Sequence, residues 1–171
     1  MIVQDELVLA PMKRRDLKEI MAIEQDVFPE PWSLNIFNSE LALRRGRSYR
    51  TGRIGKALSA YRGLMFVDEE AHVTTIAVAP DFQRRGVATA VMLDIVADAR
   101  AEKKRHLSLE VAASNGRAQG LYRRFGFAPV GVRKNYYPVT GEDAFVMWAY
   151  DIDSPAYAER LEEITVALRS R

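Results

Sequence analysis

The segment from Gln83 to Ala88 carries residue types that can bind an anion. It lies between an expected strand and a long expected helix, whose first N–H groups have no partner within the helix and whose dipole is positive there. Gly86 permits backbone conformations that other residues resist, and Arg84 and Arg85 add positive charge. Such a turn can hold a pyrophosphate, although basic turns of this kind are also common without a ligand. It has neither a Walker loop nor a G-x-G-x-x-G fingerprint, which argues against ATP hydrolysis and nicotinamide chemistry.

Two side chains that can exchange protons lie twelve residues apart, one on an expected strand and one on the helix that follows it. Glu110 has the opposite side-chain parity to Leu107 and Leu109, so its carboxylate faces either solvent or a cleft. Tyr122 lies beside the apolar face of its helix. A carboxylate and a phenol can take part in proton transfer. From the spacing alone, however, a solvated strand glutamate and a core tyrosine are the simpler interpretation.

A strand–helix–strand unit positions these groups. Residues 73–78 and 107–111 are expected strands, and the apolar periodicity between them predicts a helix over 86–102. A connection of this length makes the two strands parallel. A short helix follows over 115–125, capped by Ser114 or Asn115, and the amide of Asn115 is then free to hold an amide group of a ligand.

The remaining elements surround this unit. Before it we expect a strand over 6–10 that Pro11 ends, helices over 16–27 and 33–43, and strands over 47–54 and 57–66. After it we expect strands over 127–134 and 144–151, a polar loop over 135–143, and an amphipathic tail helix over 155–169. This order predicts one α/β (α+β) domain over residues 1–151 and a C-terminal helical extension over 152–171.

Composition excludes several classes of protein. The 171 residues include no cysteine, so a cysteine nucleophile, an iron–sulfur cluster and a disulfide scaffold are ruled out, and with only two histidines we expect no metal. The net charge of +2 makes a nucleic-acid partner unlikely from charge alone. No apolar run approaches the ~20 residues of a membrane span, and Met1–Glu6 does not resemble a signal peptide. We expect a cytoplasmic protein.

Two longer segments resemble the GNAT superfamily of acyl-CoA-dependent N-acetyltransferases. They are HVTTIAVAPDFQRRGVATAVML from His72 and LSLEVAASNGRAQGLYRRFGF from Leu107. With FPEPWS from Phe28 and RKNYYPVTGEDAFVM from Arg133, they are together similar to the RimI type, the ribosomal-protein-alanine N-acetyltransferases. The resemblance covers about residues 5–150. It implies a mixed, mostly antiparallel sheet with a central splayed parallel strand pair and helices on both faces.

The resemblance also implies roles for individual residues, with acetyl-CoA as co-substrate. A strand that pairs with the pantetheine arm matches Ile76, Ala77 and Val78. The pyrophosphate loop matches Arg84, Arg85, Gly86, Val87, Ala88 and Thr89, and the asparagine that contacts the cofactor matches Asn115. Glu110 matches the proton acceptor and Tyr122 the proton donor. Ala88 departs from the second glycine that many members have in the loop.

These roles suit direct attack of a primary amine on a thioester. An ammonium must first lose a proton, which at pH 7 costs about 1 kcal/mol for an α-amine and roughly 4–5 kcal/mol for a lysine. We expect Glu110 to accept this proton if burial raises its pKa. The phenol of Tyr122 can then protonate the leaving thiolate, or donate a hydrogen bond to it.

The acceptor side is less defined by the sequence. We expect Trp32 to shape one wall of the acceptor cleft, and the 135–143 loop, with Tyr136 and Tyr137, to shape the other. Ordinary loop residues are the alternative for each. Several arginines between 44 and 53 could contact ribosomal RNA, but a solvated face is the simpler interpretation.

Three functions remain open at this point. The first is acetylation of a protein N-terminal α-amine, with a small-subunit ribosomal protein as the partner that the resemblance implies. The second is a GNAT enzyme that acts on lysine or on a small-molecule amine. The third is a non-catalytic acyl-CoA-binding module, against which the presence of both Glu110 and Tyr122 argues. The predicted oligomeric state is a monomer or a weak dimer.

Overall fold

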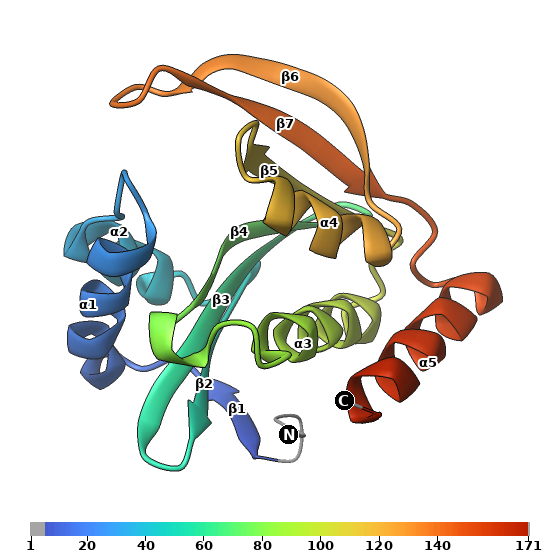
Figure 1. The fold of residues 1–171 in the computed structure, drawn as a ribbon, viewed down its shortest axis with the longest axis horizontal. Helices are drawn as coiled ribbons and strands as arrows, with labels where there is room; N and C mark the ends of the chain where they lie inside the picture. Colours follow the sequence, from blue (N-terminus) through green and yellow to red (C-terminus); the bar gives the residue numbers. More distant parts are fainter. Residues whose placement is uncertain (1–5, 171) are drawn as a thin grey trace.

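A computed structural model describes residues 6–170 and shows a single seven-stranded sheet in the order β1-β2-β3-β4-β5-β7-β6 (Figure 1). The expectation for the N-terminal residues 1–5 lies outside this range. All neighbouring strands are antiparallel except β4 and β5. The strands are β1 (Leu7–Pro11), β2 (Arg47–Ile54), β3 (Ala57–Val67), β4 (Glu70–Val78), β5 (His106–Ala112), β6 (Ala128–Tyr137) and β7 (Glu142–Ala149).

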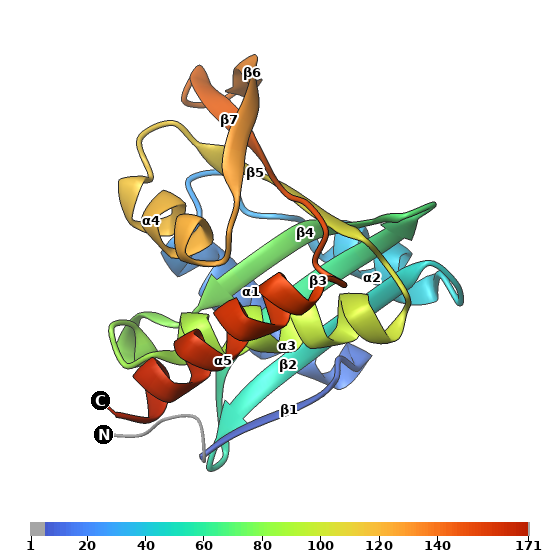
Figure 2. The ribbon, with the colours of Figure 1, turned by 90° about the vertical axis from the view of Figure 1, so that its right-hand side faces the viewer.

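Helices cover both faces of the sheet, which confirms the predicted architecture (Figures 1 and 2). They are α1 (Leu17–Val27), α2 (Leu34–Ala42), α3 (Val87–Ala101), α4 (Gly116–Arg124) and α5 (Pro155–Arg169), with short 3-10 turns η1 (Arg14–Asp16) and η2 (Pro80–Phe82) that the sequence did not predict. One buried cluster joins the sheet to α3, α4 and α5, and a second joins it to α1 and α2. Figure 2 shows α3 and α5 side by side on the first of these faces.

The parallel pair β4–β5 separates along its length. Only Glu70, Ala71 and His72 pair with β5, and beyond them the two strands diverge (Figure 2). A β-bulge in β4 adds to this separation, because Gly63 of β3 pairs with Thr75 while its neighbour Leu64 pairs with Val73. The sheet is therefore open at its centre, as the predicted splayed pair requires.

The bulge also reverses the side-chain parity of β4. Before it, Ala71 and Val73 are buried in the cluster on the α3 side. After it, Ala77 is buried in the cluster on the α1 side, while Ile76 packs toward α3. A strict alternation would place Ala77 on the same face as Val73, so the extra residue is what turns the later part of β4.

The basic hairpin of β2 and β3 is not a solvated face, which corrects the expectation for three of its arginines. Each pairs with a carboxylate of another element: Arg47 with Glu40 at 2.6 Å, Arg50 with Asp94 at 2.5 Å and Arg53 with Asp16 at 3.0 Å. A further arginine, Arg62, is fully buried and contacts Asp98 of α3 at 2.8 Å. The pairs of Arg50 and Arg62 fix α3 against the sheet, whereas those of Arg47 and Arg53 reach α2 and η1.

The β6–β7 hairpin is longer than expected. Asn135, Tyr136 and Tyr137 belong to β6, and Glu142 and Asp143 begin β7, so the predicted loop over 135–143 is wrong except for its central residues. The polar residues that suggested a loop are satisfied within the hairpin, where Asp143 accepts a hydrogen bond from the Asn135 N–H at 2.9 Å. Asn135 also has a positive φ of 50°, at a shift in the strand register.

The C-terminal helix packs onto the rest of the fold. Tyr157 and Ile164 of α5 are buried in the cluster with α3, and the Tyr157 hydroxyl donates to the Phe125 carbonyl at 2.5 Å. Leu168 is buried beside the turn that precedes α3. The boundary between residues 151 and 152 stays a prediction. Within residues 6–170, no helix has both the length and the apolar character needed to cross a lipid bilayer.

Candidate active site

A groove of about 800 Å³ opens where β4 and β5 separate. Its walls include Glu110, on the sheet face away from α3 and α4, and Tyr122, which belongs to the core on the side of those helices. Side chains from opposite faces of a sheet can line one groove only where the sheet is open between two strands. The divergence of β4 and β5 therefore creates the site.

The turn before α3 forms one end of this groove, here called the donor end. Gly86 has a φ of +84° and precedes α3 directly, and Arg84 also has a positive φ, of 62°. The first backbone hydrogen bond of the helix runs from Ala90 N–H to the Gly86 carbonyl, so the earlier N–H groups are oriented toward the turn. Gln83 donates to the Val78 carbonyl at 3.1 Å and holds the turn against the end of β4.

Most of the residues predicted to bind the cofactor line the groove. They are Ile76, Ala77, Val78, Arg84, Gly86, Ala88, Thr89 and Asn115. Two others do not line it: the Val87 side chain is buried in the core, and the Arg85 guanidinium lies 5.3 Å from the centre of the Phe82 ring. Asn115 caps α4 by accepting the Ala118 N–H at 3.1 Å, so its amide nitrogen is the part that can reach a ligand.

The opposite end of the groove, here called the acceptor end, is built from side chains. Trp32, Tyr136 and Tyr137 all line the groove, and their contact with an acceptor stays a prediction. Trp32 follows α1, whereas the two tyrosines come from the end of β6. The two walls meet where the Val139 N–H, at the tip of the β6–β7 hairpin, donates to the carboxylate of Glu30.

Glu24, a buried carboxylate that the sequence analysis missed, holds the wall of the groove that contains Trp32. Glu24 of α1 is 1 % exposed, and it accepts the Trp32 N–H at 2.8 Å and the Tyr61 hydroxyl at 2.5 Å. Burial raises the pKa of Glu24, and the two hydrogen bonds oppose this effect. Its position on the apolar face formed by Ile20 and Ile23 was the available signal, since a glutamate there needs internal partners.

Glu110 lies at the centre of the groove with a side chain that is 12 % exposed. The interpretation as a solvated strand residue is therefore wrong. His72 Nε2 lies 3.0 Å from one carboxylate oxygen, and Arg133 Nε lies 3.3 Å from the other. The hydrogen bond from His72 is the main influence that lowers the pKa of Glu110, and it outweighs the opposing effect of burial. The expected rise of this pKa is thus wrong, because the neighbouring His72 and Arg133 were not visible in the local sequence.

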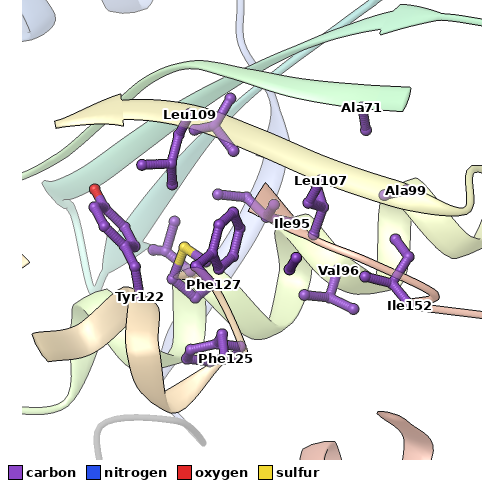
Figure 3. Close-up of a cluster of buried hydrophobic side chains, with 14 of the residues drawn as sticks. Ala71, Ile95, Val96, Ala99, Leu107, Leu109, Tyr122, Phe125, Phe127 and Ile152 are labelled. Atoms are coloured by element: carbon purple, nitrogen blue, oxygen red, sulfur yellow. The ribbon is translucent and has the colours of Figure 1, made fainter. Parts of the chain in front are cut away.

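Tyr122 is both a core residue and part of the groove. It is 6 % exposed, and its ring lies 5.9 Å from that of Phe127. Figure 3 shows its hydroxyl pointing away from Phe125 and Phe127. Burial raises the pKa of Tyr122, so the phenol keeps its proton at neutral pH and can donate it.

An open sheet with a helix N-terminus at one end and an ionised carboxylate at its centre defines an acyltransferase of the GNAT fold. Comparison with known proteins agrees, because residues 17–127 match the sequence model described as the acetyltransferase (GNAT) family. The chain belongs to this family, whose members take the acetyl group from acetyl-CoA.

Several similar proteins carry the name of one type within this family. A Bacillus subtilis protein, provisionally named a ribosomal protein bS18-alanine N-acetyltransferase, is 36% identical over 137 residues, covering 80% of this chain and 91% of its own length. The Escherichia coli enzyme of that name is 34% identical over 141 residues, covering 81% of this chain and 94% of its own. The crystal structure of the Escherichia coli enzyme superimposes with a TM-score of 0.78 at 31% identity, covering 85% of this chain and 94% of that one.

Proposed function

We propose that this enzyme transfers an acetyl group from acetyl-CoA to the N-terminal α-amine of a protein, with N-terminal alanine as the first candidate. The names of the Bacillus subtilis and Escherichia coli relatives support this acceptor class. A ribosomal protein is accordingly the first partner to test. The monomeric or weakly dimeric state and the cytoplasmic location remain predictions.

The similarity over most of the chain to relatives named for N-terminal alanine acetylation is the observation that carries the choice of an α-amine. Proton transfer supports it, because an α-ammonium has a pKa of ~7.7–8.0 and a lysine ammonium a pKa of ~10.4. This difference makes the proton of a lysine about 3–4 kcal/mol more costly to remove, whichever base accepts it. The lowered pKa of Glu110 makes it a weak base, which suits the more acidic of the two acceptors.

In the proposed mechanism, the acceptor amine attacks the thioester within the open part of the sheet. Glu110 accepts the proton that the ammonium must lose, directly or through a water molecule. Tyr122 lies on the other side of the opening and donates its proton, or a hydrogen bond, to the departing thiolate. Positioning the two substrates in one groove contributes a large part of the rate, because it replaces a chance encounter with a fixed geometry.

The donor end would hold acetyl-CoA through its backbone. Beyond His72, within the described chain, the edge of β4 that faces the gap has no β5 partner, so Ile76, Ala77 and Val78 can pair with the pantetheine arm. The N–H groups that follow Gly86 would hold the pyrophosphate, with Arg84 adding charge. Arg85 and Val87 would contribute through their backbone, since their side chains lie outside the groove lining.

Mass spectrometry of acetylated peptides tests this proposal. We would offer acetyl-CoA with a peptide that begins with alanine and contains an internal lysine, the same peptide with a formylated N-terminus, and a polyamine. We expect a single acetyl group on the α-amine of the first peptide and none on the formylated one. Modification of lysine or of the polyamine alone would overturn the α-amine assignment, and thioester binding without any transfer would favour a non-catalytic module.

A further inference from the structure

A continuous chain of hydrogen-bonding side chains leads away from Glu110 along the paired ends of β4 and β5. His72 Nε2 lies 3.0 Å from Glu110 Oε2, and His72 Nδ1 lies 2.7 Å from Ser108 Oγ. The Ser108 hydroxyl in turn donates to the Glu70 carboxylate. Glu70, His72 and Ser108 lie in the short region in which β4 and β5 still pair, and Glu110 lies two residues beyond it on β5, so the sheet register fixes their order.

The donors in this chain can be counted. The single proton of the Ser108 hydroxyl goes to Glu70, so Ser108 Oγ accepts from His72 Nδ1. With Nδ1 fixed as a donor, Nε2 is the ring position that can gain or lose a proton. When Nε2 carries no proton, its lone pair faces Glu110 and can accept the proton that Glu110 has received. Both ring nitrogens then act as donors, and the imidazolium lies between two carboxylates.

The titratable members of the chain differ in solvent exposure. The side chain of Glu110 is 12% exposed, that of His72 is 22% exposed and that of Glu70 is 28% exposed. Ser108, between His72 and Glu70, is buried and links the two. A proton that enters at Glu110 therefore ends on the more exposed of the two carboxylates. Imidazole takes up and releases protons near neutral pH, which suits an intermediate station between a buried base and water.

We propose, building on the function proposed above, that His72 receives the proton that the acceptor amine gives to Glu110, and that Ser108 and Glu70 pass it to solvent. Glu110 is the catalytic base in this scheme. The other three residues act through it and form a proton relay.

The relay conserves atoms and charge. The N–H bond of the acceptor ammonium breaks, its electron pair stays on nitrogen, and the proton bonds to a Glu110 carboxylate oxygen and then to His72 Nε2. Glu110 returns to its anionic form, and the ring becomes an imidazolium. The Nδ1–H bond then breaks as Ser108 Oγ takes that proton and gives its own to Glu70, which releases it to water.

The groups around His72 include both acids and a cation. Glu70 and Glu110 face the ring, and Arg133 of β6 contacts Glu110 at 3.3 Å. Tyr136 lies beside this arginine, with its ring centre 5.8 Å from the guanidinium carbon. The other strands place residues that do not titrate next to the relay: Met65 of β3, and Val146 and Trp148 of β7.

The pH dependence of kcat tests the relay in the full-length enzyme, with saturating acetyl-CoA and an alanine-terminated peptide. His72→Gln keeps a hydrogen-bond donor but cannot carry the proton, and we expect kcat at neutral pH to fall about tenfold to hundredfold. The acidic limb of the profile should move to lower pH, because a carboxylate alone then accepts the proton. Ser108→Ala and Glu70→Gln should give smaller losses of the same sign. His106→Gln is the control, since His106 contacts Asp151 and lies outside the groove lining.

A second variant separates proton transfer from packing. Imidazole added to His72→Ala should restore part of kcat, because the ring position is reachable from solvent, whereas a structural role predicts no rescue. An unshifted acidic limb in His72→Gln together with no rescue of His72→Ala would overturn the relay. Full activity of Ser108→Ala and Glu70→Gln would overturn its outer part.

Glu110→Gln in the same assays distinguishes the two proposals. If this variant keeps the wild-type kcat, the proposed base is wrong and the relay fails with it. If it loses activity while the two His72 variants show neither the shifted limb nor the rescue, the relay alone fails.

Discussion

The two ends of the groove are built from different parts of the chain. The donor end consists mainly of backbone, namely the unpaired edge of β4 and the first turn of α3 after Gly86. The acceptor end consists of side chains from distant elements, with Trp32 after α1 and Tyr136 on β6. A site made of backbone depends on conformation, whereas a site made of side chains depends on the identity of each residue. Substitutions at the two ends should therefore affect different steps of the reaction.

The largest effect is expected at the centre, where the two ends meet. Glu110→Gln removes the proton acceptor while keeping the size of the side chain, so kcat should fall about 10²–10⁴-fold. The affinity for acetyl-CoA, measured by calorimetry, should stay within about twofold of the wild type. Glu69→Gln is a matched control, because its side chain is 65% exposed and lies outside the groove lining. A large loss of acetyl-CoA affinity in Glu110→Gln would show that the centre and the donor end are not separate.

Removal of an acceptor-side aromatic residue should affect peptide binding alone. Trp32→Ala should raise the KM for the peptide about 30-fold, as expected for loss of a buried aromatic contact of about 2 kcal/mol. Trp32→Phe should retain most of the affinity, because it keeps an aromatic ring at this position, where the Trp32 ring packs 5.3 Å from that of Phe37. Steady-state kinetics with each substrate varied in turn measures both constants. Equal changes in the constants for peptide and acetyl-CoA would contradict the division of the groove.

The donor end should respond to backbone geometry. Gly86→Ala forces a side chain onto a φ of +84°, and its Cβ would lie 2.7 Å from Leu168. We expect acetyl-CoA affinity to fall about tenfold, which corresponds to about 1.4 kcal/mol, while the peptide KM stays unchanged. Gly55→Ala is the control, because it has a similar φ of +59° but no neighbouring atoms within 4 Å.

A double variant separates the two causes at Gly86. Leu168→Ala removes the contact but not the unfavourable φ. If Gly86→Ala in the Leu168→Ala background binds acetyl-CoA better than Gly86→Ala alone, contact with α5 contributes to the effect. The C-terminal helix would then support the turn before α3. If the affinity of Gly86→Ala matches that of the wild type, the turn does not hold the pyrophosphate.

The difference between an end built from backbone and an end built from side chains also explains which parts of the site the sequence could predict. The apolar periodicity of α3 and the strands beside it, together with Gly86, was sufficient to locate the turn before α3, because secondary structure and backbone conformation depend on nearby residues. Asn115 as the cap of α4 is a further example. The resemblance to the GNAT family supplied the role of Glu110, which spacing alone left open.

Contacts between distant residues were not predictable. The partners of Glu110 are His72, which is 38 positions away, and Arg133, which is 23 positions away. No local pattern pairs them, and the direction of the pKa of Glu110 depends on these neighbours. Glu24 was missed for the same reason, since Tyr61 and Trp32 accommodate its carboxylate. Strand register and the bulge in β4 bring such residues together.

The smallest expected effect is a pH dependence of stability. It comes from two carboxylates, that of Glu24 beside the acceptor end and that of Glu110 at the centre of the groove. Burial raises the pKa of Glu24 in the folded state, so the folded protein binds a proton there more tightly than the unfolded chain does. The contribution of Glu24 to stability is therefore full below its unfolded pKa and is lost as the pH rises through its folded pKa. The lowered pKa of Glu110 has the opposite sign, and its contribution is lost as the pH falls.

Urea denaturation of the wild type, Glu24→Gln and Glu110→Gln across pH 4 to 7 measures both contributions. The difference in free energy of unfolding between the wild type and Glu24→Gln should become less favourable to the wild type as the pH rises. The difference between the wild type and Glu110→Gln should become more favourable to it. Gly86→Ala, which changes no titratable group, should run parallel to the wild type. A slope of this difference against pH arises only where a group binds its proton differently in the folded and unfolded states. Slopes of the same sign for the two glutamate variants would therefore contradict the opposite environments that the structure gives these carboxylates.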